Sequence, residues 1–212
     1  MDWFTADPHF GHGNILKFCG RPHMSDEEKR LAKEDRYGRW RGSQETIDRH
    51  DDDLISKIND RVGVKDRLII GGDFCWGGVE AARKYLDRIK CKNVWLIEGN
   101  HDKRETGRLF ARTMIEGTIS CHGQDIYFHH RPQRSWYGSL GGASPLSGHV
   151  RAKKQREGQA GDGRRTQDIC VDACGYVPLS YDDILAYMTP RIPKFLARKN
   201  AVLKGEKLRF TW

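Results

Sequence analysis

Carboxylate, imidazole and amide side chains recur in five short clusters along the chain, each at a point where a strand-like apolar run gives way to a glycine-marked loop. In chain order the clusters are Asp7-Pro8-His9, Gly71-Gly72-Asp73, Gly99-Asn100-His101-Asp102, His129-His130 and Gly148-His149. Oxygen and imidazole donors of this kind suit divalent ions such as Mn, Fe, Zn or Ni. Because the donors come from five separate loops, only a folded scaffold can collect them. The pattern therefore indicates catalytic metal chemistry more than a structural metal clip.

The spacing within these clusters fits the binding of two ions. Residues two apart in an extended segment point to the same side, so Asp7 and His9 can bind a single ion. Asp73 lies at the tip of an apolar run next to two glycines, and it is suited to bridging two cations through its two oxygens. The donors left for a second ion are the amide oxygen of Asn100 and the imidazoles of His130 and His149.

Two cations about 3.5–4 Å apart form a clamp used in phosphoryl transfer, in which the ions hold a bridging hydroxide as nucleophile and neutralise charge on the phosphate oxygens. A departing alkoxide still needs a proton. His101 follows Asn100 directly and is placed to donate that proton, while its neighbour Asp102 is expected to orient the imidazole ring. The residue types therefore predict attack of hydroxide on the phosphorus of a phosphate ester.

The expected secondary structure places the clusters at strand ends. Apolar runs predict strands over residues 3–6, 67–70 and 93–97, with further candidates over 124–128 and 168–172. Helices are predicted over 79–89, over 181–188, and over 25–60 in two parts that separate at Gly42-Ser43, the first opened by a Ser25/Glu28 capping box. Residues 10–14 are expected to form a turn, and Asp51-Asp52-Asp53 to open a helix where their charge favours its dipole. Strands alternating with helices indicate an α/β fold whose ligands gather outside the strand ends.

Composition sets broader limits. A chain of 212 residues is long enough for one substantial core. Its 37 Lys and Arg against 29 Asp and Glu favour an anionic partner, phosphate ester or nucleic acid, without choosing between them. The first residues lack signal-peptide features, and no apolar run approaches about 18 residues, so we expect a cytoplasmic protein with no membrane segment. Six scattered cysteines predict reduced thiols rather than a disulfide framework.

The motifs, in this order, resemble those of the calcineurin-like metallophosphoesterase superfamily: D-x-H, G-D, G-N-H-D, an isolated His and G-H-x-H. The match runs from Asp7 to Asp172, and the stretches at residues 7–12, 128–132 and 171–172 are most similar to small bacterial and phage members. The resemblance implies an α/β (α+β) fold, a four-layer β-sandwich flanked by helices with metals at the strand-end loops. It implies a single domain over residues 1–190, with a helical insertion at about 25–60 and a basic loop at about 151–167, and then a basic C-terminal extension over 191–212.

The resemblance also implies a role for each matching residue. Asp7 and His9 would bind a first metal, Asp73 would bridge, and Asn100, His130 and His149 would bind a second, while His101 and Asp102 would be catalytic. Of the adjacent histidines, His130 rather than His129 matches the isolated His, because it is followed by x-Pro. The remaining histidines, His23, His50, His122 and His129, are expected to be structural.

Arg151 departs from the family pattern. It stands where the second His of G-H-x-H would complete the first metal site, and a guanidinium stays protonated and cannot bind a cation. Three outcomes are open: a weak, water-ligated first ion, replacement of the imidazole by His12, or an Arg151 that contacts the substrate phosphate. We favour a weak first site with Arg151 near the substrate. Arg151→His should then raise first-site affinity for Mn, and unchanged occupancy on titration would contradict this.

Three functions follow from these patterns. The leading one is a divalent-metal-dependent phosphoesterase of phosphodiesters, with monoesters as a further substrate class. The alternative enzyme is a nuclease or nucleotide phosphodiesterase that recruits substrate through the basic loop, with Trp136 and Tyr137 either stacking on a base or only packing. The third is a non-catalytic scaffold with an impaired first site. The ligand types do not choose among Mn, Fe, Zn and Ni, and the sequence specifies no oligomeric state.

Overall fold

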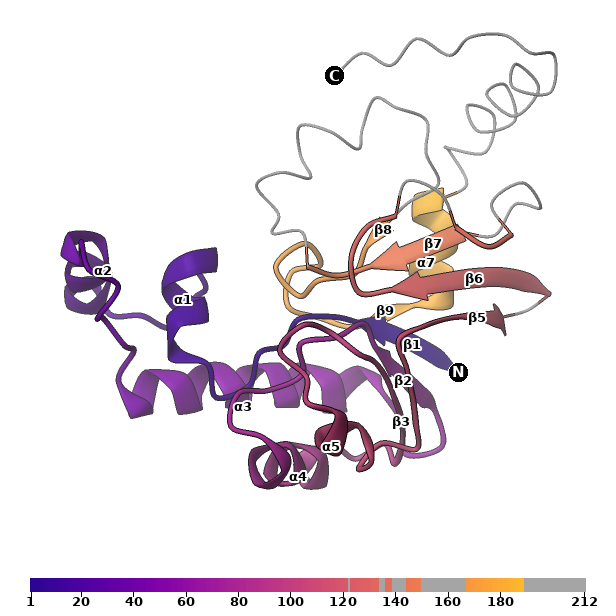
Figure 1. The fold of residues 1–212 in the computed structure, drawn as a ribbon, viewed down its shortest axis with the longest axis horizontal. Helices are drawn as coiled ribbons and strands as arrows, with labels where there is room; N and C mark the ends of the chain where they lie inside the picture. Colours follow the sequence, from indigo (N-terminus) through magenta and orange to yellow (C-terminus); the bar gives the residue numbers. More distant parts are fainter. Residues whose placement is uncertain (122, 134–135, 139–143, 150–166, 189–212) are drawn as a thin grey trace, which may run out of the picture.

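The computed structural model describes residues 1–121, 123–133, 136–138, 144–149 and 167–188 (Figure 1). The predicted basic loop, apart from residue 167, and the C-terminal extension fall outside these residues, as do Arg151 and His122. Among the described residues no helix is both long and apolar enough to cross a membrane. All six cysteines are free.

The first sheet is built mainly from parallel strands. Its order is β4 (Arg112–Met114), β3 (Asn93–Ile97), β2 (Arg67–Ile70), β1 (Asp2–Thr5) and β9 (Leu179–Ser180). Neighbours from β1 to β4 are parallel, and only β9 runs antiparallel, against β1. Parallel pairing brings the carboxyl ends of β1, β2 and β3 to one edge of the sheet.

The second sheet has the order β5 (Glu116–Cys121), β6 (Gln124–His129), β7 (Ser144–Ser147) and β8 (Gln167–Asp168). Strands β5 and β6 are antiparallel, whereas β6, β7 and β8 are parallel neighbours. The backbone N–H of Val171 donates to the carbonyl of Ala6, and that of Asp7 donates to the carbonyl of Gly72. These bonds continue the pairing beyond the strand ends, so the loops of both sheets meet at the carboxyl ends of their strands.

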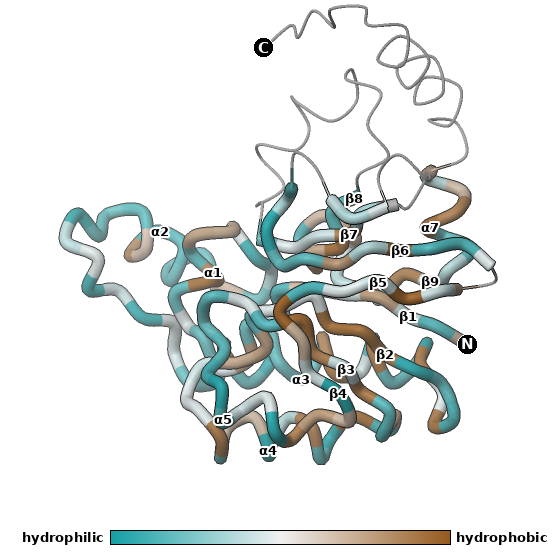
Figure 2. The backbone as a smooth tube through the Cα atoms, turned by 45° about the vertical axis from the view of Figure 1, so that its right-hand side comes forward, coloured by the Kyte–Doolittle hydropathy of each residue, from teal (hydrophilic) through white to brown (hydrophobic). Residues whose placement is uncertain are grey.

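Two apolar cores explain the layers. Leu68 and Ile70 of β2 pack with residues of α3 (Gln44–Arg61) and α4 (Val79–Arg88) on one face of the first sheet. Ile69, on the opposite face, packs with Ile126 and Leu146 of the second sheet and with α7 (Tyr181–Met188). A strand buried on both faces must be apolar at successive positions, which is the pattern of residues 68–70. Hydrophobic segments accordingly run through the centre of the sheets in Figure 2.

Two further helices, α1 (Gly13–Cys19) and α2 (Asp26–Glu34), extend away from the sheets (Figures 1 and 2). A further helix, α5 (Arg104–Gly107), is short and follows β3. The expected mixed α/β fold of two sheets flanked by helices is therefore observed. The predicted strands over 67–70 and 93–97 and the capping box of Ser25 and Glu28 are confirmed.

Three local predictions are wrong. The strand expected over 168–172 ends at Asp168, because the chain then turns through residues 171–177. The turn expected over 10–14 gives way to α1 at Gly13. Asp51 does not open a helix, since α3 begins seven residues earlier at Gln44, and its carboxylate is buried in the middle of the helix. The short strands β4, β5, β7 and β9 were not predicted.

Candidate metal centre

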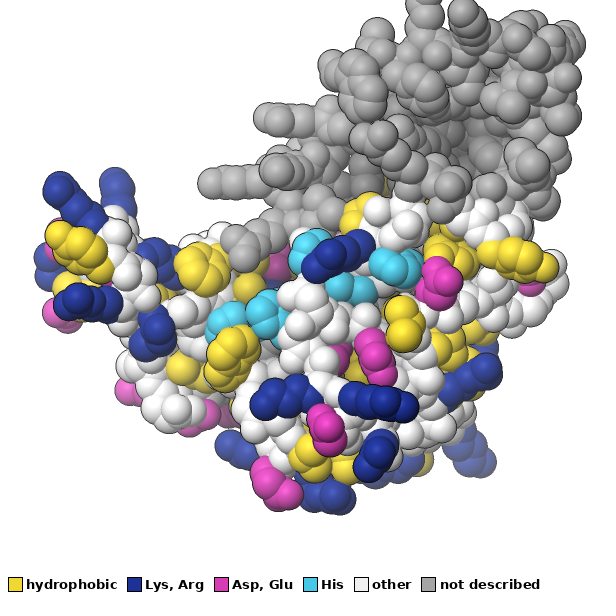
Figure 3. All heavy atoms as spheres, in the orientation of Figure 1, with side chains coloured by type: hydrophobic (Ala, Val, Ile, Leu, Met, Phe, Trp, Pro, Cys, Tyr) yellow, Lys and Arg dark blue, Asp and Glu magenta, His cyan; other side chains and the backbone are white. Residues whose placement is uncertain are grey.

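Each expected ligand lies just beyond the carboxyl end of a strand. Asp7 follows β1, Asp73 follows β2 and Asn100 follows β3, while His130 and His149 follow β6 and β7 of the second sheet. Because the strands within each set are parallel, the five loops converge. On the face shown in Figure 3 the histidine side chains gather in one place, beside Lys or Arg and hydrophobic side chains.

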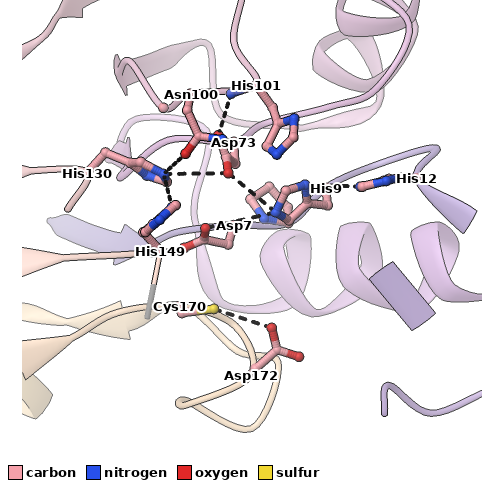
Figure 4. A network of polar contacts seen from close by, with 12 residues as sticks. Asp7, His9, His12, Asp73, Asn100, His101, His130, His149, Cys170 and Asp172 are labelled. Atoms are coloured by element: carbon pink, nitrogen blue, oxygen red, sulfur yellow. Dashed lines mark hydrogen bonds and ion pairs between the residues drawn. The ribbon is translucent and has the colours of Figure 1, made fainter. Parts of the chain in front are cut away.

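Asp73 is the centre of this group. Its Oδ2 lies 3.5 Å from His9 Nε2 and 3.5 Å from His130 Nε2, and Figure 4 shows the carboxylate between the two rings. Its other oxygen, Oδ1, accepts the backbone N–H of His101 at 2.9 Å. The sequence predicts that the two oxygens of Asp73 bridge two cations. The structure instead commits Oδ1 to the backbone and leaves Oδ2 facing both histidines.

The donor atoms form two groups that share Asp73. We call Asp7, His9 and Asp73 the first pocket, and Asp73, His130 and His149, with Asn100 beside them, the second pocket. Within each group of three the donor atoms lie within 4.8 Å of one another. The three residues of the first pocket are buried, whereas the second includes the exposed His149. This is the arrangement that two divalent ions sharing a carboxylate require.

The second pocket is arranged around His130. Its Nδ1 lies 2.8 Å from the carbonyl of Gly71, so the ring N–H donates there and Nε2 is left for an ion. Nε2 lies 3.1 Å from His149 Nδ1 and 3.3 Å from Asn100 Oδ1. Three donors of the expected type therefore point to one position. His129, in contrast, accepts the backbone N–H of Arg131 at its own loop, so only the predicted member of the pair enters the site.

The backbone at the candidate ligands is unusual. Among the described residues six non-glycine residues have positive φ, and four of them are Asp7 (56°), His9 (51°), Asp73 (53°) and His149 (67°). A non-glycine residue in this region costs on the order of 1–3 kcal/mol and persists only where the surroundings hold it. Strain concentrated on four proposed ligands is the signature of a functional site rather than of four ordinary turns.

Asp102 holds the loops together instead of orienting His101. Its Oδ2 accepts the backbone N–H groups of Asp73 and Gly99, and its Oδ1 accepts that of Phe74. Within the described part of the chain no hydrogen bond joins this carboxylate to the His101 ring. A Cβ added to Gly99 would lie 2.3 Å from Asp73 Oδ1, so the two loops approach as closely as they do only because residue 99 is glycine. The predicted role of Asp102 is therefore corrected: it positions the Asp73 loop.

Asp7 is held by the loop that follows β7. Its Oδ2 accepts the backbone N–H of His149 at 2.9 Å, and its Oδ1 lies 4.0 Å from His9 Nε2. One oxygen thus fixes the carboxylate while the other faces the first pocket. A Cβ on Gly148 would lie 2.2 Å from Asp7 Oδ2, which makes glycine necessary at that position.

Arg21 supports the first pocket from behind, and sequence reasoning missed it. The residue is 1% exposed, and its guanidinium donates to the carbonyls of Asp7 (2.7 Å) and Pro8 (2.8 Å). The same group makes a two-point ion pair with Asp172 at 3.0 and 2.8 Å. His50 lies 3.3 Å from it, and that histidine contacts the buried Asp51 at 2.9 Å. Asp51 in turn accepts the Gly11 backbone N–H, so buried charges hold the loop from residue 7 to residue 11.

The electrostatics differ between the pockets. Burial raises the pKa of the Asp7 carboxyl to about 7 and lowers the pKa of His9 to about 3. Burial also acts against charge on His130 and Asp73, but their mutual attraction outweighs it, so the pKa of His130 rises to about 9 and that of Asp73 falls to about 2. Without an ion, a protonated His130 supplies positive charge to Asp73. A cation in the second pocket must displace that proton.

Two histidines lie beside the first pocket. His101 is exposed, and its ring centroid lies 5.4 Å from that of His9. His12 Nδ1 lies 3.4 Å from His9 Nδ1, on the ring edge opposite the Nε2 that faces the carboxylates. His12 is therefore placed to orient His9, and it is not among the donors grouped in either pocket. Its ring stacks on Trp76, an aromatic residue that sequence reasoning missed; Tyr137 is 83% exposed.

Comparisons with known proteins cover most of the chain. The profile of the family described as calcineurin-like phosphoesterase matches residues 3–180. An uncharacterised protein of Methanocaldococcus jannaschii is 27% identical over 186 residues, which are 86% of this chain and 88% of the relative. A solved protein of unknown function from Aquifex aeolicus has a TM-score of 0.60 and 18% identity, over 87% of this chain and 97% of that one. At that identity the second likeness concerns the fold alone.

Proposed function

Because the chain belongs to the calcineurin-like phosphoesterase family, we propose that it hydrolyses phosphodiesters, and monoesters as a further class, with a divalent ion in each pocket. Family membership implies a metal-dependent phosphoric ester hydrolase; the preference for diesters and the residue roles are our proposal. The observation that carries it is the position of Asp73 Oδ2, at 3.5 Å from a histidine of each pocket. Carboxylate, imidazole and amide donors also suit Mn, Fe, Zn or Ni.

In this proposal Asp7 and His9 hold the first ion, Asn100, His130 and His149 hold the second, and Asp73 serves both. Bound ions of this kind supply a nucleophile at neutral pH and offset negative charge on the phosphate oxygens. The residues themselves do the positioning. Asp102 and the His101 N–H fix the Asp73 loop, and the Gly71 carbonyl fixes the tautomer of His130. All of these contacts exist before substrate arrives, so the site is preorganised.

His101 is the proposed general acid. Its backbone is tied to Asp73 Oδ1, while its ring is exposed beside the first pocket, where it can donate a proton to the departing oxygen. Hydrolysis of an ester whose leaving group is a weak base should depend less on proton donation by His101. Arg151 remains a proposed contact of the substrate phosphate on sequence grounds alone.

The test is reconstitution of metal-free protein with Mn, Fe, Zn or Ni in turn, followed by assay with bis-p-nitrophenyl phosphate and p-nitrophenyl phosphate. We expect hydrolysis that depends on added metal and is faster with the diester. Activity on the monoester alone would overturn the diester preference. A protein that stays inert with every metal would favour the scaffold alternative.

The chain offers a matched pair of variants for this assay. His130→Ala removes a proposed ligand, whereas His129→Ala removes the adjacent ring, which contacts the Arg131 loop. We expect the first variant to lose metal-dependent hydrolysis and the second to retain it. Equal loss in both would show that the loop, rather than the His130 ligand, is responsible.

A further inference from the structure

Trp76 presents an exposed aromatic surface beside the candidate metal site. It lies three residues after Asp73 in the loop that follows β2, and 53% of its surface is exposed. The loop is not loosely held, since the Trp76 backbone N–H donates to the carbonyl of Phe10 at 2.8 Å. Phe10 itself pairs with Phe74 through a 3.0 Å backbone hydrogen bond. The exposed indole is therefore carried by the same backbone pairing that aligns the Asp7 and Asp73 loops.

The indole joins a continuous set of aromatic rings. It stacks on His12 with ring centroids 4.6 Å apart and an interplanar angle of 13°, and it lies 5.6 Å from the ring of His101 at 52°. His12 in turn contacts His9 of the first pocket. Figure 4 shows His9, His12 and His101 on the side of Asp73 opposite His130. The aromatic surface thus begins at a proposed metal ligand and ends at the solvent, beside the proposed general acid.

We propose that Trp76, supported by His12, stacks on the base of a nucleoside ester, so that the preferred substrate is a phosphoester whose leaving alcohol carries a nucleobase. The inference rests on the proposed function, because the phosphate is placed by the two pockets. Indole rings bind nucleobases by stacking regardless of base identity, and removal of one such contact changes binding by on the order of tenfold. The basic balance of the chain, +8 at neutral pH, favours an anionic substrate of this kind.

The position of Trp76 also indicates which ester group of the phosphate carries the base: the leaving alcohol. Its nearest proposed catalytic neighbour is His101, which protonates the departing oxygen in the proposed reaction. Water is added across the P–O5′ bond: its oxygen is transferred to phosphorus, and the departing 5′ oxygen gains a proton. A packing role for Trp76 differs from this in one measurable way. A ring that only packs on His12 would affect all substrates equally, whereas a stacking ring distinguishes substrates with a base from those without one.

The discriminating substrates are thymidine 5′-methyl phosphate and its abasic analogue, in which hydrogen replaces thymine. Both have the same phosphate and nearly the same 5′ alkoxide. We expect wild-type kcat/KM to be on the order of tenfold higher with the base present, with thymidine as the product. Trp76→Phe should keep most of this ratio, and Trp76→Leu, apolar but not aromatic, should bring it close to one. A wild-type ratio of one, or a ratio that Trp76→Leu leaves unchanged, overturns the inference.

A binding measurement separates this inference from the proposed function. Thymidine monophosphate should quench the tryptophan fluorescence of the metal-loaded protein, while 2-deoxyribose 5-phosphate should not. Of the six tryptophans, Trp76 should carry that signal, so Trp76→Phe should abolish the quenching. Quenching without hydrolysis of any ester would support base stacking on Trp76 and contradict the proposed phosphoesterase activity. Hydrolysis of thymidine 5′-methyl phosphate and its abasic analogue at the same rate, without quenching, would support the phosphoesterase activity and contradict base stacking on Trp76.

Discussion

The two pockets share Asp73 but are held in place by different means. The first pocket is buried, and the guanidinium of Arg21, paired with Asp172 and close to His50, anchors the loop that carries Asp7 and His9. The second pocket is held by backbone groups at strand ends, such as the Gly71 carbonyl at His130, and its His149 is exposed. Substitutions of residues that are not ligands should therefore lower the metal affinity of the first pocket more than that of the second.

The largest loss of activity should come from a substitution at the residue that both pockets share. Asp73→Asn keeps the shape of the side chain but removes the charge shared between His9 and His130. We expect both ions to be lost and kcat/KM to fall on the order of 10³-fold. Metal analysis with the activity assay checks this. Retention of one tightly bound ion would show that the pockets are less dependent on the shared oxygen than their geometry indicates.

Arg21→Met should separate the pockets. The substitution leaves Asp172 buried without its partner, which costs about 3–5 kcal/mol in the free energy of unfolding. It also releases the Asp7 and Pro8 carbonyls, and we expect first-pocket affinity for Mn to fall about 10–100-fold while the second pocket changes little. Urea denaturation and calorimetric titration measure the two effects.

Two controls distinguish position from stability for this variant. The double variant Arg21→Met/Asp172→Asn removes the unpaired charge, so stability should recover while first-pocket affinity should not. Arg67→Met breaks a two-point ion pair with Asp2 at the other end of β1 and β2 and should leave both affinities intact. An equal loss of affinity in Arg67→Met would attribute the effect to general destabilisation.

The pockets should also differ in the pH dependence of ion binding. Below its pKa a ligand holds a proton that must leave before the ion binds, so affinity falls as pH falls. The pKa of His130 is about 9, and second-pocket affinity should rise by up to about tenfold per pH unit until that pH. The pKa of Asp7 is about 7, and the gain in the first pocket should end there. Calorimetry in buffers of different ionisation enthalpy counts the protons released; absence of release at pH 7.5 would contradict the His130 prediction.

The smallest effect should come from a change that leaves both pockets unaltered. Glu28 accepts hydrogen bonds from the Ser25 and Ser43 N–H groups and from the Thr46 hydroxyl, and although burial acts against its charge, these bonds lower its pKa to about 2. The stabilisation is present above the ordinary value of 4.5 and is lost as pH falls toward 2.

Glu28→Gln should thus lower the free energy of unfolding by about 1 kcal/mol at pH 7 and by less at pH 3. Urea titrations at the two pH values measure this difference. The exposed neighbour Glu27 gives the control, since Glu27→Gln should change stability little at either pH. A change in metal affinity in Glu28→Gln would show that the α2 and α3 junction communicates with the site.

Sequence reasoning could propose the candidate ligands because ligand type and strand end are both local features. Residues 68–70 and 94–97 are apolar throughout, so the ends of these strands, and the donors that follow, can be located without a fold. The supporting residues have no such signal. Arg21 lies outside the ligand clusters and their strands, and its burial depends on Asp172, which is 151 residues away. Asp102 is predicted to orient the adjacent His101, yet two of the three N–H groups that donate to its carboxylate lie on another loop, at Asp73 and Phe74.

Aromatic residues near the site show the same limit. Trp136 and Tyr137 follow His130 closely in sequence, and Trp76 follows Asp73 by three residues, so closeness in sequence does not distinguish them. Which of these aromatic residues faces the candidate metal site depends on the direction of each loop after its strand. Backbone pairing between Phe10 and Trp76 sets the direction of the Trp76 loop. Residue spacing within one segment does not show which distant segment it will pair with.

The convergence of loops from residues 7, 73, 100, 130 and 149 has a thermodynamic consequence. In an unfolded chain these donors are far apart, so an ion that binds the folded site has little affinity for the unfolded chain. Added metal should then raise the melting temperature in proportion to the logarithm of its concentration above Kd, contributing about 2.7 kcal/mol at a hundredfold excess over Kd. Thermal unfolding would thereby report which ion the site prefers before any substrate is known.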